Sequence, residues 1–405
     1  MRRRYMLDSC LAGAATARAG DEMSGPALML AGFACTGSAT EASSLLGGMT
    51  IAAALGGPVL GTLLDRAARP GRLLAGALAL YATGLAVILT GLGCLPLPVI
   101  LLIAVAAGLL GPALSGGWTA QLPRVVPPEG LPRANALDAM TFNMAGLAGP
   151  ALAGGVSQLL GAPSAVAVSA ALIGLAVPAA WRLPARFPPA RRAAATSVID
   201  DLAAGLRFIL RNPRLARATL TSVISCTGQG MLTAATPLLG ARVLGGAGHG
   251  AMLLSCTAVS ALAANAVLAR FPRWIAPDTL IWTSALILAA ASALAASCRP
   301  VPLITAALVA GIGEGPLLTA LFAVRHREAP GHLRGQIFTT GASLKITGFA
   351  LGASVAGPLA TRSLAGALLM AGGVQLLAAL ACFAVRGDSV PAHGHGHGHG
   401  HGQAR

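Results

Sequence analysis

The sequence has little charge and almost no lysine. Charged side chains make up 10% of its 405 residues, and Lys345 is the single lysine beside 27 arginines. Soluble domains carry about 25% charged residues, so this composition excludes an ordinary soluble fold. A phosphate-binding loop of the type G-x-x-x-x-G-K-[ST] needs a lysine before serine or threonine. Lys345 is followed by Ile346, which excludes an ATP motor of that type.

Cysteine and histidine do not form metal-binding patterns within the apolar part of the chain. The seven cysteines are scattered and include no C-x-x-C pair, so we expect small buried side chains rather than disulfides or a zinc site. Residues 393–402 read HGHGHGHGHG and can bind Zn²⁺ or Ni²⁺ weakly, although a low-complexity tail without function is the favoured interpretation. His249, His326 and His332 fall in predicted loops. We therefore expect no metal site and no cofactor.

Long apolar runs take the place of a polar surface. Hydrophobic residues make up 55% of the chain, and a membrane-spanning helix needs about 20 apolar residues in succession. Runs of that length without strict alternation favour helices over barrel strands. We predict an all-α membrane protein with twelve transmembrane helices, at residues 10–36, 44–64, 73–92, 97–120, 135–160, 164–181, 214–238, 249–269, 279–297, 301–323, 336–360 and 364–385. The first of these is interrupted by charges and is predicted to be a retained helix rather than a signal peptide.

The distribution of arginine predicts the orientation of these helices. With the N-terminus inside, 23 of the 28 Arg and Lys residues fall in inside segments and three in outside loops. Positive charge concentrates on the cytoplasmic side of membrane proteins, so both termini are predicted to be cytoplasmic. The same bias explains the net charge of +15 without a nucleic-acid partner.

The chain divides into two halves. We predict one six-helix bundle at 1–181, a cytoplasmic linker at 182–213, a second six-helix bundle at 214–386 and a Gly/His-rich tail at 387–405. Residues 197–211 within the linker form an amphipathic pattern suited to the membrane surface, interpreted mainly as a structural linker helix, with a calmodulin-type target as a remote alternative. RVVPPEGLPRAN at 124–135 and RHREAPGHLRGQ at 325–336 repeat weakly. Halves related in this way are typical of secondary transporters, with the substrate site between them.

The loop after the second predicted helix carries a specific sequence pattern. It reads GTLLDRAARPGR, from Gly61 to Arg72, and resembles the G-x-x-x-D-R-x-G-R signature of the major facilitator superfamily. The resemblance implies that Asp65 faces the N-terminus of the eleventh predicted helix, where a helix dipole favours negative charge. It also implies a cytoplasmic gate built from Gly61, Asp65, Arg66, Gly71 and Arg72. The alternative is that these arginines serve only the topology.

A second pattern lies in the fifth predicted helix. Gly146, Gly149, Pro150 and the pair Gly154-Gly155 resemble the superfamily's antiporter signature G-x-x-x-G-P-x-x-G-G, with both spacings one residue off. Pro150 removes a backbone hydrogen bond and can kink the helix, and ordinary glycine packing is an equal alternative. The fourth predicted helix lacks the arginine of classical drug–proton antiporters.

Five charges lie at predicted membrane depth, where a charge costs at least about 2.5–3.5 kcal/mol. Arg18 precedes Asp21 and Glu22 by three and four residues, so the three share a helix face. Glu314 and Lys345 lie in the tenth and eleventh predicted helices. We interpret these five as proton-coupling or cavity residues. The alternative is an Arg18–Asp21/Glu22 bridge within one helix that only holds the bundle.

Neutral polar residues complete the candidate site. Asn143 and Gln229 are weak candidates for substrate contact, since interhelical hydrogen bonding is their commoner role. Asp138 is predicted to be a surface or gate residue. The leading hypothesis is a monomeric proton-coupled exporter of a small amphipathic molecule in a plasma membrane. The high Ala, Gly and Arg content favours a bacterial inner membrane. Uptake of a small metabolite and a non-transporting sensor or scaffold are the alternatives, and no constellation of catalytic residues suggests an enzyme.

Overall fold

The chain folds almost entirely into helices. The computed structural model describes residues 2–185, 198–246, 249–272 and 274–384, and within these ranges no strand occurs. The proposed tail at 387–405 lies outside the described residues. The first half contains α1 (Arg2–Thr36), α2 (Ala39–Arg66), α3 (Pro70–Gly91), α4 (Leu97–Gly108), α5 (Leu122–Val125), α6 (Leu131–Leu160) and α7 (Ala162–Trp181). The second contains α9 (Pro213–Val243), α10 (His249–Arg270), α11 (Pro277–Ala295), α12 (Pro300–Glu328), α13 (Arg334–Arg362) and α14 (Leu364–Ala384), and α8 (Val198–Arg211) lies between the halves in sequence.

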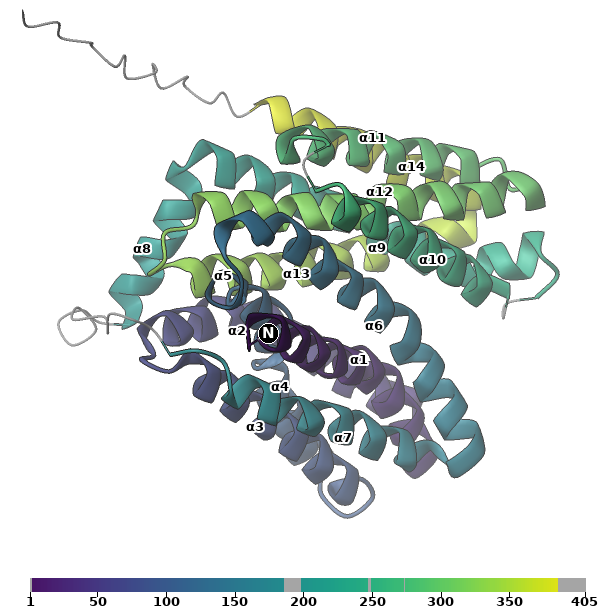
Figure 1. Cartoon of the computed structure of the whole chain (residues 1–405). Coiled ribbons are helices and arrows are strands. Elements are labelled where there is room, and N and C mark those ends of the chain that lie inside the picture. The colour runs from purple at the N-terminus through teal and green to yellow at the C-terminus, as the bar shows by residue number, and fades with distance from the viewer. Residues whose placement is uncertain (1, 186–197, 247–248, 273, 385–405) are drawn as a thin grey trace, which may run out of the picture.

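The long helices form two groups that lie side by side (Figure 1). In the first group α1 packs against α6 and α7, and in the second α9 packs against α13 and α14. The groups meet where α2 packs on α13 and α6 packs on α10. In Figure 1, α8 lies at one end of the molecule, here called the α8 end, and the opposite end is called the open end.

Eight helices in the described part of the chain are long and apolar enough to span a membrane by length and composition. The four other long helices of the described chain are α1, α6, α9 and α13, which carry more polar residues. Polar groups inside a bilayer face a partner helix or a cavity rather than lipid. These four helices therefore belong around the interior of the molecule, and all four contribute to the cavity described below.

The fourth predicted span is less regular than the sequence suggests. We predicted one helix over 97–120, whereas α4 ends at Gly108 and is followed by a π-helical turn at Ala113–Gly117. Pro112 lies just before this turn and supplies no backbone N–H donor. Gly116 of the turn packs against the backbone of Phe338 in α13. The irregular segment thus lies at the contact between the halves, and π-helical turns are frequent at functional sites.

The linker helix packs against the helical bundle. The predicted amphipathic helix is present as α8, with 14 residues. Ile209 is buried against Leu215, Ala329 and Ile337, and the Nε2 amide of Gln336 donates to the Leu202 carbonyl at 2.8 Å. Helix α8 therefore covers the α8 end of α13, although Leu206 and Leu210 remain exposed.

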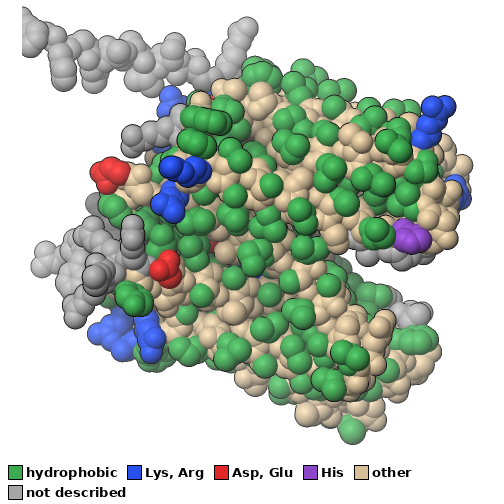
Figure 2. Space-filling view, turned by 45° about the vertical axis from the view of Figure 1, so that its right-hand side comes forward, with side chains coloured by type: hydrophobic (Ala, Val, Ile, Leu, Met, Phe, Trp, Pro, Cys, Tyr) green, Lys and Arg blue, Asp and Glu red, His purple; other side chains and the backbone are tan. Residues whose placement is uncertain are grey.

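The surface has the pattern of a membrane protein. On the face shown in Figure 2, charged side chains lie towards the two ends of the molecule, and hydrophobic side chains cover the length between them. Among the exposed side chains are Leu80, Leu102, Leu175 and Leu380, each more than 60% accessible. Apolar side chains exposed over so much of the surface are unfavourable in water, and burial in a bilayer accounts for them. Figure 2 also shows the molecule hollowed between its two lobes at the open end.

Candidate functional site

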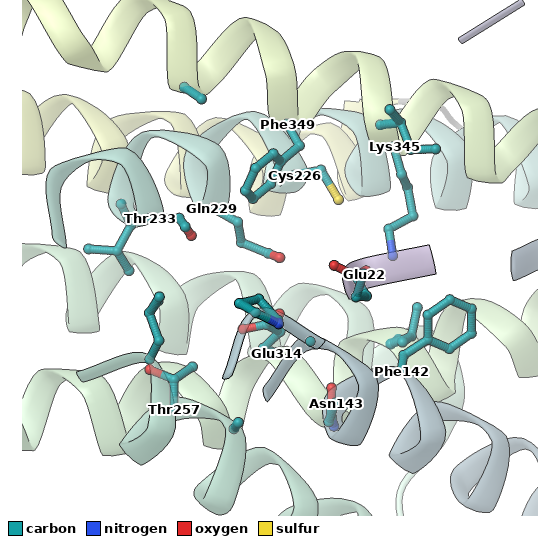
Figure 3. A pocket seen from close by; sticks show the side chains of 18 of the residues that line it. Glu22, Phe142, Asn143, Cys226, Gln229, Thr233, Thr257, Glu314, Lys345 and Phe349 are labelled. Carbon is teal, nitrogen blue, oxygen red and sulfur yellow. The ribbon is translucent and has the colours of Figure 1, made fainter. Parts of the chain in front are cut away.

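A central cavity of about 800 Å³ lies between the two groups of helices. Its lining extends to Leu239 and Leu303, near the open-end termini of α9 and α12. Towards the α8 end the lining stops at Arg325 and Phe338. Apolar side chains make up most of the wall, as expected for a site that takes small molecules. The polar residues are few, and Figure 3 shows several of them pointing into one space.

At the α8 end, Asp65 of α2 bonds to α13. Both carboxylate oxygens accept backbone hydrogen bonds from the first turn of α13, Oδ1 from Gly335 N–H and Oδ2 from Gln336 N–H, each at 2.8 Å. A carboxylate at a helix N-terminus satisfies unpaired N–H groups and interacts favourably with the helix dipole. This contact joins the last turn of α2 to α13 and so links the two halves of the molecule.

Close packing of α2 on α13 continues this contact from Asp65 towards the cavity. Gly61 has no side chain where Gln336 and Thr339 approach, and a Cβ at this position would lie 2.7 Å from the Gln336 nitrogen. Thr339 Oγ1 donates to the Gly57 carbonyl at 2.6 Å. Ser343 Oγ donates to the Ala53 carbonyl at 2.6 Å. Ala53 is also the last residue of α2 that lines the cavity. The close contact between α2 and α13 therefore begins where the cavity ends.

The other predicted gate residues lie beside this contact. Arg66 Nε bonds Asp201 Oδ2 of α8 at 2.7 Å. Gly71 packs instead against α7, where a Cβ would lie 2.5 Å from the Ala180 carbonyl oxygen. The Arg72 guanidinium lies 5.0 Å from the centre of the Trp181 ring. Gly71 and Arg72 thus fix α3 to α7 within the first half, whereas Asp65 and Gly61 contact the second half.

Three of the predicted intramembrane charges face each other across the cavity. Glu22 comes from α1, Glu314 from α12 and Lys345 from α13, and all three line the wall. In Figure 3 the Lys345 side chain extends towards Glu22, and Glu314 points into the same space. Lys345 acts electrostatically on both carboxylates. These three charges therefore face one another across a mostly apolar cavity.

Asp21 occupies a separate position on the same wall. Its Oδ1 accepts a hydrogen bond from the Tyr81 hydroxyl at 2.8 Å, and Tyr81 also contacts the Ser24 hydroxyl at 3.1 Å. Tyr81 comes from α3 and is 2% exposed. Asp21 is therefore anchored by a neighbouring helix, whereas Glu22 is exposed to the cavity.

The structure contradicts the alternative of a bridge within α1, and Arg18 is not among the residues that line the cavity. Its guanidinium does not bridge to Asp21 or Glu22 but pairs with Asp138 of α6, with Nη1 and Oδ1 2.8 Å apart. Arg18 Nη2 and Asp138 Oδ2 also both bond Thr119 Oγ1, at 3.0 and 2.7 Å. Asp138 is 1% exposed, so its prediction as a surface residue is wrong. The helical spacing placed Arg18 near two carboxylates, but a third carboxylate on another helix satisfies it.

The glycine of the antiporter-like pattern packs directly against Glu22. Helices α1 and α6 approach so closely at Gly149 that a Cβ there would lie 2.6 Å from the Glu22 Cβ and 2.9 Å from the Met23 nitrogen. Gly146, Gly154 and Gly155 face open space instead. Pro150 lines the cavity and lies within a helix that continues to Leu160. The Gly149–Pro150 pair therefore forms the wall behind a candidate coupling carboxylate.

Both neutral polar candidates line the cavity. Asn143 Nδ2 is buried without a hydrogen-bond partner, so this amide is available to a bound molecule. Gln229 Nε2 donates to Ser225 Oγ at 3.3 Å, and Figure 3 shows the Gln229 side chain pointing into the cavity. Among the described residues the cavity therefore holds one amide that is already paired and one that is not.

Sequence reasoning missed several cavity residues. Arg325 was assigned to an inside loop, but it lies in α12, lines the cavity and is 2% exposed. Its neighbour His326 is also helical and buried, and its Nε2 lies 3.0 Å from the Thr119 carbonyl oxygen, so the prediction of a loop is wrong there. Phe322 and Phe338 belong to a buried cluster at the cavity wall, and the partly buried Phe142 packs against it. Helix α12 continues for four residues past its last apolar residue. No sequence signal indicates this extension, because charged residues that follow an apolar run are usually assigned to a loop.

No group of three or more potential metal ligands occurs within the described part of the chain. The histidine-rich tail lies outside those residues.

Comparison with known proteins identifies the family. Residues 10–343 match the model of the Major Facilitator Superfamily. The chain belongs to the major facilitator superfamily. It is a membrane-embedded, multi-pass secondary transporter, and members of this family are transporters rather than enzymes.

Individual relatives are similar over nearly the whole chain. An uncharacterized MFS-type transporter, y4rN of Sinorhizobium fredii, is 28% identical over 360 residues, which cover 86% of this chain and 87% of the relative. The human organic anion transporter MFSD10 (TETRAN) has a TM-score of 0.78 at 18% identity and covers 94% of this chain and 100% of its own. A bacterial homologue of the iron transporter ferroportin, in its outward-facing state, has a TM-score of 0.71 at 15% identity over 93% and 98% of the two chains. These structural similarities establish the shared fold.

Proposed function

We propose that this transporter exports a small amphipathic molecule in exchange for protons, by alternating access of the central cavity. The observation that carries the proposal is the arrangement of Asp21, Glu22 and Glu314 in a cavity with apolar walls. Carboxylates in such surroundings exchange protons when access to water changes. If one of these carboxylates carries a proton while the cavity reorients, the movement of the proton is coupled to the movement of the substrate.

The closed α8 end corresponds to the cytoplasm in this proposal. Asp65 and the arginines Arg66, Arg69 and Arg72 lie at that end, whereas Arg242, Arg299 and Arg362 lie at helix termini of the open end. The excess of arginine over the whole sequence supports this orientation. The cavity then faces outward, both termini are cytoplasmic, and the membrane is a plasma membrane, such as a bacterial inner membrane.

The two halves serve as the moving units. Residues 1–181 and 214–386 each carry their own packed core, and the linker at 182–213 joins them. The bond between Asp65 and α13 holds the cytoplasmic side shut while the site faces outward. The transporter functions as a monomer in the bilayer, because the cavity is complete within one chain.

The direction of transport rests on the antiporter-like pattern. Gly149 lies against α1 at Glu22, and Pro150 lines the cavity, so this pattern supports the helix contact that carries the candidate coupling carboxylate. Proton-driven uptake uses the same groups in the opposite sense, and the experiment below separates the two.

A compound-sensitivity panel in a host stripped of its own exporters tests this function. The intact protein is compared with an Asp21→Asn/Glu22→Gln variant and with Glu314→Gln, at equal membrane abundance. We expect resistance to at least one amphipathic compound from the intact protein and its loss in one of the variants. Increased sensitivity would indicate uptake. Resistance retained by all three proteins would refute coupling through these carboxylates.

A further inference from the structure

Arg325 lies at the cavity floor in an unusual setting. The side chain is 2% exposed and lines the cavity at its closed end. Its guanidinium carbon lies 6.0 Å from the centre of the Phe338 ring. Gly341 lies against the other side, where a Cβ would be 2.5 Å from that carbon. Helix α13 thus leaves room for this guanidinium by carrying glycine at 341.

The guanidinium has no protein counterion in the described chain. Arg325 Nε and Nη2 have no hydrogen-bond partner, and none of the ion pairs found among the described residues includes Arg325. Three acids of this end are engaged elsewhere: Asp138 pairs with Arg18, Asp65 bonds α13, and Glu328 pairs with Arg327. An arginine stays charged in proteins, and a buried charge without a partner is strongly unfavourable.

The groups around this charge favour an organic anion over an inorganic one. Phe322 and Phe338 pack with ring centres 6.0 Å apart, and Phe142 lies 5.7 Å from Phe322. Phe142, Phe322, Phe338 and Phe349 all line the cavity. Lys345 supplies a second cation on the same wall, although it acts on Glu22 and Glu314. A planar carboxylate matches the donor geometry of a guanidinium, and an aromatic or aliphatic body matches the remaining wall.

We propose that the cavity binds an amphipathic organic carboxylate, with Arg325 as the residue that pairs with its carboxylate group. This assignment rests on the proposed function in one respect, namely that the central cavity is the substrate site. It does not depend on the direction of transport or on proton coupling. The remaining carboxylates of the cavity are then free for the proton, since the substrate charge is met by Arg325.

Binding of matched probes to the purified full-length protein tests the proposal. The probes are phenylacetate, 4-phenylbutyrate and 1-naphthylacetate, each paired with its uncharged carboxamide, so that size and shape are held nearly constant. Binding is measured by calorimetry and by the shift in thermal midpoint, in detergent and without any proton gradient. The variants are Arg325→Gln, Arg325→Lys and, as a control on the same helix, Arg327→Gln, which removes a partly exposed charge outside the cavity.

We expect at least one carboxylate to bind tenfold or more tightly than its carboxamide. That preference should disappear in Arg325→Gln, survive in part in Arg325→Lys and stay unchanged in Arg327→Gln. Because Arg325 has no ion-pair partner among the described residues, Arg325→Gln should fold with an unchanged or higher thermal midpoint, so loss of binding is not loss of structure. Equal binding of carboxylate and carboxamide, a preference that survives Arg325→Gln, or no carboxylate bound by folded protein would each overturn the proposal.

The result separates this proposal from the proposed function. Carboxylate binding through Arg325 without proton-dependent flux in vesicles would contradict proton coupling and leave the substrate class intact. Proton-dependent export of compounds that carry no anionic group would support the function and overturn the role of Arg325.

Discussion

Arg18 Nη1 and Asp138 Oδ1 lie 2.8 Å apart, with the two side chains 2% and 1% exposed. The pair joins α1 to α6, and Thr119 and Thr141 bond the same guanidinium. The Phe142 ring covers it, with its centre 3.7 Å from the guanidinium carbon. The arginine nearest in sequence to Asp21 and Glu22 is thereby removed from the cavity, which leaves Lys345 as the cation that faces Glu22.

Removing one member of the Arg18–Asp138 pair should destabilise the protein more than replacing both members. Arg18→Leu alone leaves Asp138 buried and unpaired, and the loss of one partner of a buried pair destabilises by about 3–5 kcal/mol. The double variant Arg18→Leu/Asp138→Leu removes both charges and should recover much of that loss. Thermal unfolding of the purified variants measures the difference. Equal destabilisation in the single and double variants would contradict a compensating ion pair.

Removing the Asp65 carboxylate should open the α8 end. Asp65→Ala leaves the N–H groups of Gly335 and Gln336 without their acceptors, so the closed state of that end loses stability. Asp65→Asn keeps one oxygen acceptor and should have a smaller effect. We expect Asp65→Ala to shift the population towards a cavity open at the α8 end and to slow net transport.

Labelling of a single cysteine measures this shift. Thr233→Cys lies in the cavity wall, and it is placed in a background in which the seven native cysteines are alanine. A membrane-impermeant maleimide added from the open end should react more slowly in Asp65→Ala than in the parent. An unchanged labelling rate from both sides would show that Asp65 does not hold the gate.

Gly149 should tolerate no side chain, whereas Gly154 should. Gly149→Ala places a methyl group within 3 Å of Glu22 and Met23 atoms of α1, and overpacking of this kind typically costs about 1–3 kcal/mol. The separation of α1 from α6 would displace Glu22 from the cavity wall, so we expect a substantial loss of transport. Gly154 on the same helix faces open space, and Gly154→Ala is the matched control for transport and thermal midpoint. Equal activity of the two variants would show that the close contact is dispensable.

Much of the fold was predictable because its signals are local. A run of apolar residues specifies a membrane helix without reference to the rest of the chain, and eleven of the twelve predicted spans have a helical counterpart close to their predicted ranges. The family resemblance, carried by Gly61 and Asp65, was confirmed by the match over residues 10–343. The prediction of one continuous helix over 97–120 was wrong, because Gly116 packs against Phe338 of the other half and no local sequence pattern indicates that contact.

The candidate site was only partly predictable, because its contacts join residues that are far apart in the sequence. The sequence located Asp21, Glu22, Glu314 and Lys345 by the cost of a charge at membrane depth, and the structure places all four around one cavity. It could not assign partners, because helical spacing reports neighbours three and four residues apart, whereas Arg18 and Asp138 are 120 residues apart.

The sequence by itself determined that this is a helical membrane protein of a transporter family and which of its residues carry charge into the bilayer. The tertiary structure decided which of those charges neutralise each other, that Arg325 joins the cavity, and that both Asp65 oxygens bond the first turn of α13. Hydrophobic burial depends on composition and can be read along the chain. Ion pairing depends on distances of a few ångströms between helices, which only the packing of the two halves sets.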